Sequence, residues 1–169
     1  MPDPREHAQN RNVIETLLRQ IPGFRGYLEK EYRRESDALQ RTWLSDRLDR
    51  SKRGVDGVTR ALVDAGQIDQ LPQWDRLRGR IDKLSSRIRS AMDGYSGFFD
   101  LVQIDEAALD RVYQFDAALV QRVDDFADRV ERLEGEEESA AGELQRLLDE
   151  TEALEKIWDE REDILQGLD

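Results

Sequence analysis

The sequence predicts an all-α fold: an elongated antiparallel helical bundle with coiled-coil-like seams, built from four long helices and a short N-terminal helix. Three observations lead to this prediction. Charged residues make up 38% of the 169 residues, against ~25% in typical globular chains, so narrow apolar seams suit the chain better than a thick core. Apolar residues recur at alternating spacings of three and four, without the alternation typical of strands. All four prolines lie outside the strongly periodic stretches.

The N-terminal region predicts a short amphipathic helix that stops at a sharp turn. Residues 1–9 are expected to form a flexible leader. A helix over 10–20 follows, capped by Asn10 or Asn12, with its apolar side chains on one side. The segment 21–27, with the sequence IPGFRGY, then ends this helix, because proline lacks a backbone donor and glycine permits sharp turns.

Two longer helices are expected next. The first covers about 28–65, and a kink is expected at Gly54 and Gly57, because glycine in a helix costs about 1 kcal/mol relative to alanine. The second begins near residue 71, and its apolar positions form the clearest seam in the chain. The residues of this seam are Trp74, Leu77, Ile81, Leu84, Ile88 and Ala91.

The C-terminal part predicts two more helices. Asp105 is a good N-cap for the first of them, which Gly135 interrupts or ends. The three glutamates at 136–138 suit the positive first turn of the last helix. We therefore expect a bundle domain over 10–134 and an acidic C-terminal helix over 135–169, which packs on the bundle or projects as a stalk. The seam of this last helix contains Leu144, Leu147, Thr151, Leu154, Trp158, Arg161, Leu165 and Leu168.

The net charge of −12 is unevenly distributed along the chain. Residues 1–99 contain 19 Lys and Arg against 15 Asp and Glu, whereas residues 100–169 contain 7 against 23. The acidic half would repel nucleic acid, because phosphate contacts require cations, so no nucleic-acid partner is expected. The asymmetry instead suits two copies arranged head to tail, or an acidic end docked on a basic partner.

Several classes of site are disfavoured by composition. The chain has no cysteine, and its single histidine, His7, lies in the expected leader. Thiolate chemistry, Ser-His-Asp arrangements and the commonest metal sites therefore lack their residues, and no catalytic, cofactor-binding or metal-binding residue is predicted. No run of 18 apolar residues exists and no signal peptide is recognisable, so we expect a cytoplasmic protein without integral membrane insertion.

The segments 21–27 and 94–100 (GYSGFFD) each bring glycines close to aromatic rings at a helix junction. One interpretation is a small aromatic pocket or a partner groove, with one of the arginines at 33–34 facing Asp100 or Asp116. The other is a tight interhelical corner, plugged by aromatic side chains and held by structural ion pairs. The second is simpler, since aromatics at corners usually supply burial. The candidate residues are Phe24, Tyr27, Arg33, Arg34, Tyr95, Phe98, Phe99, Asp100 and Asp116.

Several short motifs resemble a bacterial family of helical proteins without an assigned function. These motifs are IPGFRGY at 21–27, KEYRRESD at 30–37, GYSGFFD at 94–100 and the segment 105–111. The resemblance covers about residues 10–134 and implies an all-helical fold, with no site residue carried over. The general shape is also similar to that of phage-shock-protein-A-type coiled-coil membrane-stress proteins, although their basic, lipid-inserting N-terminal helix is not matched here.

These patterns favour a non-enzymatic cytoplasmic adaptor or scaffold that binds a protein partner or self-associates. One alternative is a small-ligand binder or enzyme with its pocket at the corners 21–27 and 94–100. Another is a peripheral membrane-stress-associated helical protein that contacts the membrane through residues 10–21, whose polar face is not rich in Lys and Arg as interfacial helices usually are.

Overall fold

The computed structural model describes residues 4–91, 99, 105–136 and 138–166, with side chains from residue 11 onward. Every regular element within these ranges is a helix, which confirms the all-α prediction. None of the helices in this part of the chain has the length and apolarity needed to cross a membrane. The elements are α1 (Pro4–Gln20), α2 (Lys30–Asp64), the 3-10 helix η1 (Ile68–Gln70), α3 (Leu71–Ser90), α4 (Glu106–Arg132), the 3-10 helix η3 (Ala140–Gly142) and α5 (Leu144–Gln166).

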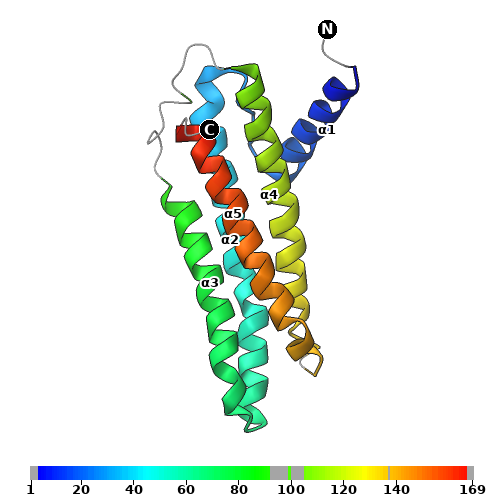
Figure 1. The fold of residues 1–169 in the computed structure, drawn as a ribbon, viewed down its shortest axis with the longest axis vertical. Coiled ribbons are helices and arrows are strands. Elements are labelled where there is room, and N and C mark those ends of the chain that lie inside the picture. Colours follow the sequence, from blue (N-terminus) through cyan, green and yellow to red (C-terminus); the bar gives the residue numbers. More distant parts are fainter. Residues whose placement is uncertain (1–3, 92–98, 100–104, 137, 167–169) are drawn as a thin grey trace.

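Four helices pack around one core. Helix α2 packs against α3 and α4, and α5 also packs against α3 and α4, whereas α1 lies on α4 (Figure 1). In Figure 1, α2 and α4 run downward and α3 and α5 run upward, so consecutive helices from α2 to α5 reverse direction. We call the end where α2 and α4 begin the corner end. The opposite end, where η1 and η3 lie, is the turn end.

The glycines of α2 bring it close to α4. Helix α2 runs without a break through Gly54 and Gly57, and the kink expected there stays a prediction. A Cβ atom added to Gly54 would lie 1.9 Å from the carbonyl oxygen of Val130 in α4, and one added to Gly57 would lie 3.0 Å from Cγ of Glu134. The missing side chains therefore allow the two helix backbones to touch, and at Gly54 no larger residue fits without a shift of backbone.

Two helix starts differ from the predictions. Helix α1 begins at Pro4 rather than at residue 10, because proline with its fixed φ is well suited to the first turn of a helix. Helix α5 begins at Leu144 rather than at the glutamates after Gly135. Glu136 and Glu138 lie in a turn instead, in which the backbone N–H of Ser139 donates to the carbonyl of Glu136 at 3.0 Å.

The N-cap of α4 and the position of α5 bear on two further expectations. The carboxylate of Asp105 accepts a hydrogen bond from the backbone N–H of Ala107 at 3.0 Å, which confirms the predicted cap. Helix α5 packs on α3 and α4, so it is part of the bundle and does not project as a stalk.

Candidate functional site

At the corner end, the chain turns tightly against α4. Gly26 has a φ of +86°, a conformation that residues with a Cβ rarely adopt. A Cβ atom at Gly26 would also lie 2.6 Å from the hydroxyl oxygen of Tyr113. That hydroxyl accepts a hydrogen bond from the backbone N–H of Tyr27 at 2.7 Å. The glycine therefore allows the backbone to reach Tyr113, and the turn places the ring of Tyr27 inside the bundle.

The ring of Tyr27 leads into a buried polar cluster. We define this cluster as Tyr27, Asp37, Gln40, Asp116 and Arg161, which are all at most 8% exposed. The Tyr27 hydroxyl donates to Oδ2 of Asp116, and Arg161 Nε lies 2.5 Å from Oδ1 of the same carboxylate. Arg161 also reaches Asp37, with an Nη2–Oδ1 distance of 2.7 Å. Gln40 Nε2 donates to Oδ1 of Asp116 at 3.1 Å. One network of hydrogen bonds and ion pairs thus joins helices α2, α4 and α5 to Tyr27 at the corner end.

Burial and charge pairing set the protonation of this cluster. Burial and the neighbouring Asp116 carboxylate raise the pKa of Tyr27 well above its ordinary value, so the phenol stays neutral and donates. Burial opposes the charge on Arg161, but Asp116 and Asp37 together raise its pKa well above the ordinary value. Burial raises the pKa of Asp116, and Arg161 offsets part of that rise. The cluster therefore carries a cation between two carboxylates, which compensates the cost of burying each charge.

Aromatic rings and a buried arginine surround the cluster. Tyr27 stacks on Phe99 with ring centroids 5.1 Å apart, contacts Tyr113 at the same distance, and meets Phe24 edge-on at 5.5 Å. Arg33 Nε donates to the backbone carbonyl of Tyr27 at 2.7 Å. Such contacts fill the space around the Tyr27 ring, which is fully buried.

The structure brings together several of the predicted candidates. Phe24, Tyr27, Phe99 and Asp116 meet at the corner end, with Arg33 beside them. Arg34 lies on the exposed side of α2. The cation that pairs with Asp116 is Arg161 rather than one of the arginines at 33–34, because α5 folds back and brings its own arginine into the core. Three candidates, Tyr95, Phe98 and Asp100, lie outside the described residues.

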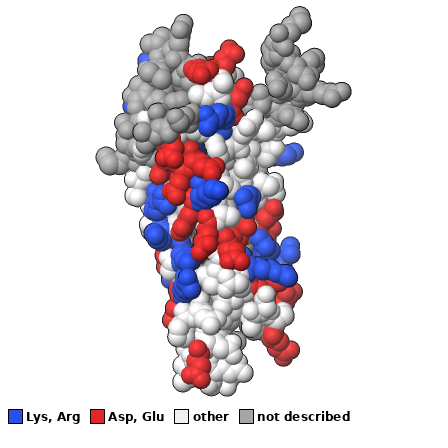
Figure 2. Space-filling model, in the orientation of Figure 1, with Lys and Arg blue, Asp and Glu red and all other residues white. Residues whose placement is uncertain are grey.

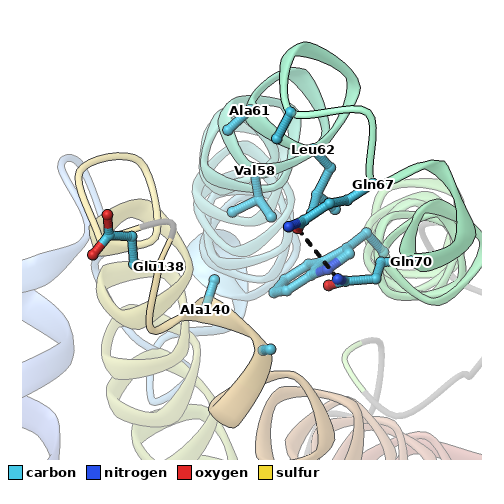
Figure 3. A pocket seen from close by; sticks show the side chains of 10 residues that line it. Val58, Ala61, Leu62, Gln67, Gln70, Glu138 and Ala140 are labelled. Atoms are coloured by element: carbon cyan, nitrogen blue, oxygen red, sulfur yellow. Dashed lines mark hydrogen bonds between the residues drawn. The ribbon is translucent and has the colours of Figure 1, made fainter.

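The second feature is a cavity at the turn end, which we call the turn-end notch (Figure 3). It has a volume of about 480 Å³ and opens to solvent between the α2–η1–α3 connection and η3. Gln67 and Gln70 form one side, joined by a 3.3 Å hydrogen bond between their side chains, and Glu138 lies on the opposite side. The residues that line the notch are Val58, Ala61, Leu62, Ala65, Gln67, Gln70, Trp74, Glu138, Ala140 and Ala141. A smaller cavity of about 220 Å³ shares Ala141 and continues toward α5.

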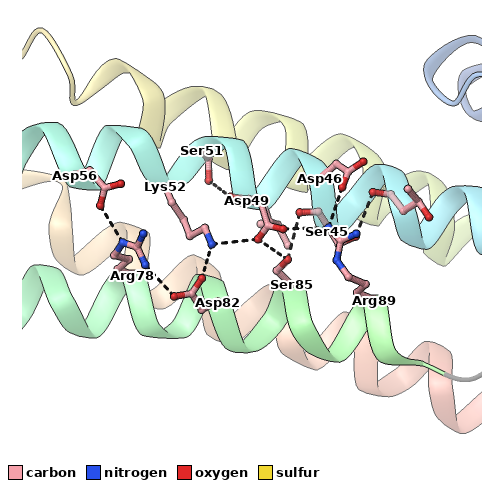
Figure 4. A network of polar contacts seen from close by, with 12 residues as sticks. Ser45, Asp46, Asp49, Ser51, Lys52, Asp56, Arg78, Asp82, Ser85 and Arg89 are labelled. Atoms are coloured by element: carbon pink, nitrogen blue, oxygen red, sulfur yellow. Dashed lines mark hydrogen bonds and ion pairs between the residues drawn. The ribbon is translucent and has the colours of Figure 1, made fainter.

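Ion pairs join each pair of neighbouring helices in the bundle. Between α2 and α3, Lys52, Arg78 and Arg89 bind carboxylates across the interface (Figure 4). Arg47 of α2 reaches three carboxylates of α4, at 124, 128 and 131, at distances of 2.6–2.9 Å. Arginines of α3 pair with acidic residues of α5, and Arg122 of α4 pairs with Glu150 of α5. Part of the acidic half therefore pairs with arginines of the basic half of the same chain, and in Figure 2 the two signs intermingle along the bundle.

No family model, no curated protein and no solved structure matches the chain. The resemblance to a bacterial helical family consequently stays a prediction. Among the described residues, no cluster of His, Asp or Glu has the arrangement needed to hold a metal ion.

Three members of the polar cluster are absent from the candidates that the sequence predicted, namely Asp37, Gln40 and Arg161. A signal for Arg161 was present, because it occupies a seam position of the last helix, where apolar residues are expected. Gln40 carried no comparable signal. Within the cluster every Asp116 oxygen accepts at least one hydrogen bond, and the only buried side-chain N or O atom without a partner among the described residues is Oε1 of Gln40. The arrangement holds helices together and leaves at most 8% of any member of the cluster exposed.

Proposed function

We propose that the chain is a non-enzymatic adaptor or scaffold of the cytoplasm that binds another protein. In this proposal, an elongated antiparallel bundle with coiled-coil-like seams acts as a rigid rod, and one of its ends offers a surface for a partner. The proposal extends the all-helical fold and depends on a contrast between the two ends.

The observation that carries the proposal is the open apolar surface at the turn end. The turn-end notch is lined mainly by alkyl side chains and amides, which suit binding more than proton transfer or nucleophilic attack. Two large apolar side chains next to it in the chain are exposed to solvent, Val63 by 57% and Ile68 by 65%. Exposed apolar surface beside a cavity is typical of sites where a partner docks.

The corner end gives less support to the alternative of a ligand pocket. Tyr27 is fully buried against its aromatic neighbours, and Arg33 is buried and bonded to the backbone. A ligand would have to displace these contacts in order to enter between the described residues.

The test is capture followed by reconstitution. The tagged full chain is cross-linked in lysate of its source cells, and each captured protein is then purified and mixed with the chain in analytical ultracentrifugation. We expect a defined complex of the chain with one purified protein, and sedimentation of the free chain slower than that of a sphere of equal mass. A chain that forms no complex with any purified protein, and that carries a tightly bound small molecule instead, would overturn the proposal.

A further inference from the structure

Resting on the proposed function, we infer that the turn-end notch is the docking site, and that it takes a protein segment presenting a large apolar side chain with a Lys or Arg beside it. The inference combines the apolar lining of the notch with the charge of its rim.

The interior of the notch selects for an apolar side chain. Val58, Leu62 and Trp74 line the notch with apolar atoms and are at most 9% exposed. The volume of about 480 Å³ falls within the range of about 300–1,000 Å³ that ligand pockets usually have. An inserted side chain would cover this apolar lining, and the paired amides of Gln67 and Gln70 would face the backbone of the inserted segment.

The rim of the notch selects for a cation. Glu138 lines the notch, and Glu134 lies against Gly57, one residue from the lining residue Val58. Asp64 and Asp69 lie in the adjoining end of α2 and in η1. These four acidic residues are exposed, and none of them makes an ion pair within the described part of the chain.

The rim carboxylates differ in this respect from the acidic residues that pair across the helix interfaces. Glu131, only one helical turn before Glu134, pairs with Arg47, whereas the rim carboxylates are left to solvent. Fewer arginines than carboxylates at the turn end are exposed and without an ion pair in the described residues. These arginines are Arg60, Arg76 and Arg132. The excess of negative charge attracts a Lys or Arg of a partner and repels phosphate groups, which argues for a protein segment rather than nucleic acid or an anionic lipid surface.

A peptide-display selection on the immobilised full chain tests the inference and does not require the natural partner to be identified. The library is counter-selected on an Ala65→Trp variant, because Ala65 is exposed and lines the notch, so a large ring there fills the site without disturbing the core. We expect the enriched peptides to carry a large apolar residue within four positions of Lys or Arg. A synthetic copy of the leading peptide should bind the wild type and bind Glu138→Lys at least tenfold more weakly.

The matched control is Glu160→Lys, which makes the same change of charge at an exposed residue of α5 near the corner end. Binding of the peptide should be unchanged in this variant. The inference is overturned if the enriched peptides lack the apolar and cationic pair, or if they bind Glu138→Lys and the wild type equally. It is also overturned if the notch holds a second copy of this chain, which would be seen as a dimer that Ala65→Trp dissociates. If a captured natural partner binds Ala65→Trp as well as the wild type, the adaptor function survives and only the docking site is wrong.

Discussion

The two ends of the bundle are held by different kinds of contact. At the corner end, the core includes the polar cluster, in which Tyr27, Asp116 and Arg161 are bound to one another with at most 1% exposure. Toward the turn end, the interior is mainly apolar, and α2 and α4 meet through the backbone contact at Gly54. Around the polar cluster the described side chains are buried against one another, whereas the turn end opens into the turn-end notch.

This difference indicates that the two ends of the bundle have different roles. Directional bonds accept only one arrangement of the groups that make them, so the polar cluster can fix how α5 and the 21–27 turn sit on the bundle. Alkyl packing is not directional, and it tolerates an open cavity at its edge. We therefore expect substitutions at the corner end to affect folding and those on the rim of the notch to affect binding.

The largest effect is expected for Arg161→Met, which leaves the carboxylate of Asp116 buried without its cation. Removal of one partner of a buried ion pair typically costs about 3–5 kcal/mol. The free energy of unfolding, measured by urea titration with circular dichroism, should fall by about that amount. Arg146→Met is the control, because Arg146 lies in the same helix with 74% of its side chain exposed, and its loss should cost less than about 0.5 kcal/mol. Equal effects of the two substitutions would contradict a special role for the corner end.

An intermediate effect is expected for Gly54→Ala, at the contact between α2 and α4. The added methyl group meets the backbone of α4 and should separate the helices at a cost of about 1–3 kcal/mol. Gly79→Ala is the matched variant, since it lies in the exposed middle of α3 with no atom within 4 Å of the added Cβ. That variant should be more stable than the wild type by about 0.5–1 kcal/mol. Thermal unfolding of both variants reveals the sign, and a stabilised Gly54→Ala would show that the helices do not touch there.

The smallest effect is expected at Asp49 in the α2–α3 network. Burial opposes its charge, but bonds from Ser85, Lys52 and Arg89 hold its pKa below the ordinary value of 3.8. A carboxylate with a depressed folded pKa stabilises the fold above its unfolded pKa and loses that contribution as the pH falls through the folded pKa.

The wild type and Asp49→Asn should accordingly differ by about 0.5 kcal/mol or less at pH ~6, because the group is partly exposed. The difference should shrink below pH ~4, where the wild-type carboxyl becomes protonated. Urea midpoints measured across this range provide the check. A difference that stays constant with pH would mean that the charge of Asp49 contributes nothing.

Local sequence patterns were sufficient to predict the presence of the helices and the N-cap of one of them. The predicted seam of α3 is buried from Trp74 to Ile88, and Asp105 caps α4 as expected. These features depend on neighbours within a few residues, which the sequence displays directly. The start of α5 at Leu144 was missed because the glutamates after Gly135 favour a helix start equally well on charge alone.

The features that define the two ends depend on distant residues and were not predictable. Asp116 and Arg161 are 45 positions apart, and only the packing of α4 on α5 brings them together. The contact at Gly54 depends on the register between α2 and α4, so a glycine that lowers helix propensity proved to be a packing requirement. The turn-end notch depends on how the η1 and η3 connections lie beside each other, which no periodicity records.

The most direct test is a double-mutant cycle between Asp116→Asn and Arg161→Met, with the free energy of unfolding measured for the wild type, both single variants and the double variant. If these two groups neutralise each other in the core of the corner end, the double variant loses less stability than the sum of the two single variants, with a coupling of about 2 kcal/mol or more. Additive losses, with a coupling near zero, would show that the two side chains do not act on each other and would contradict the account of the corner end.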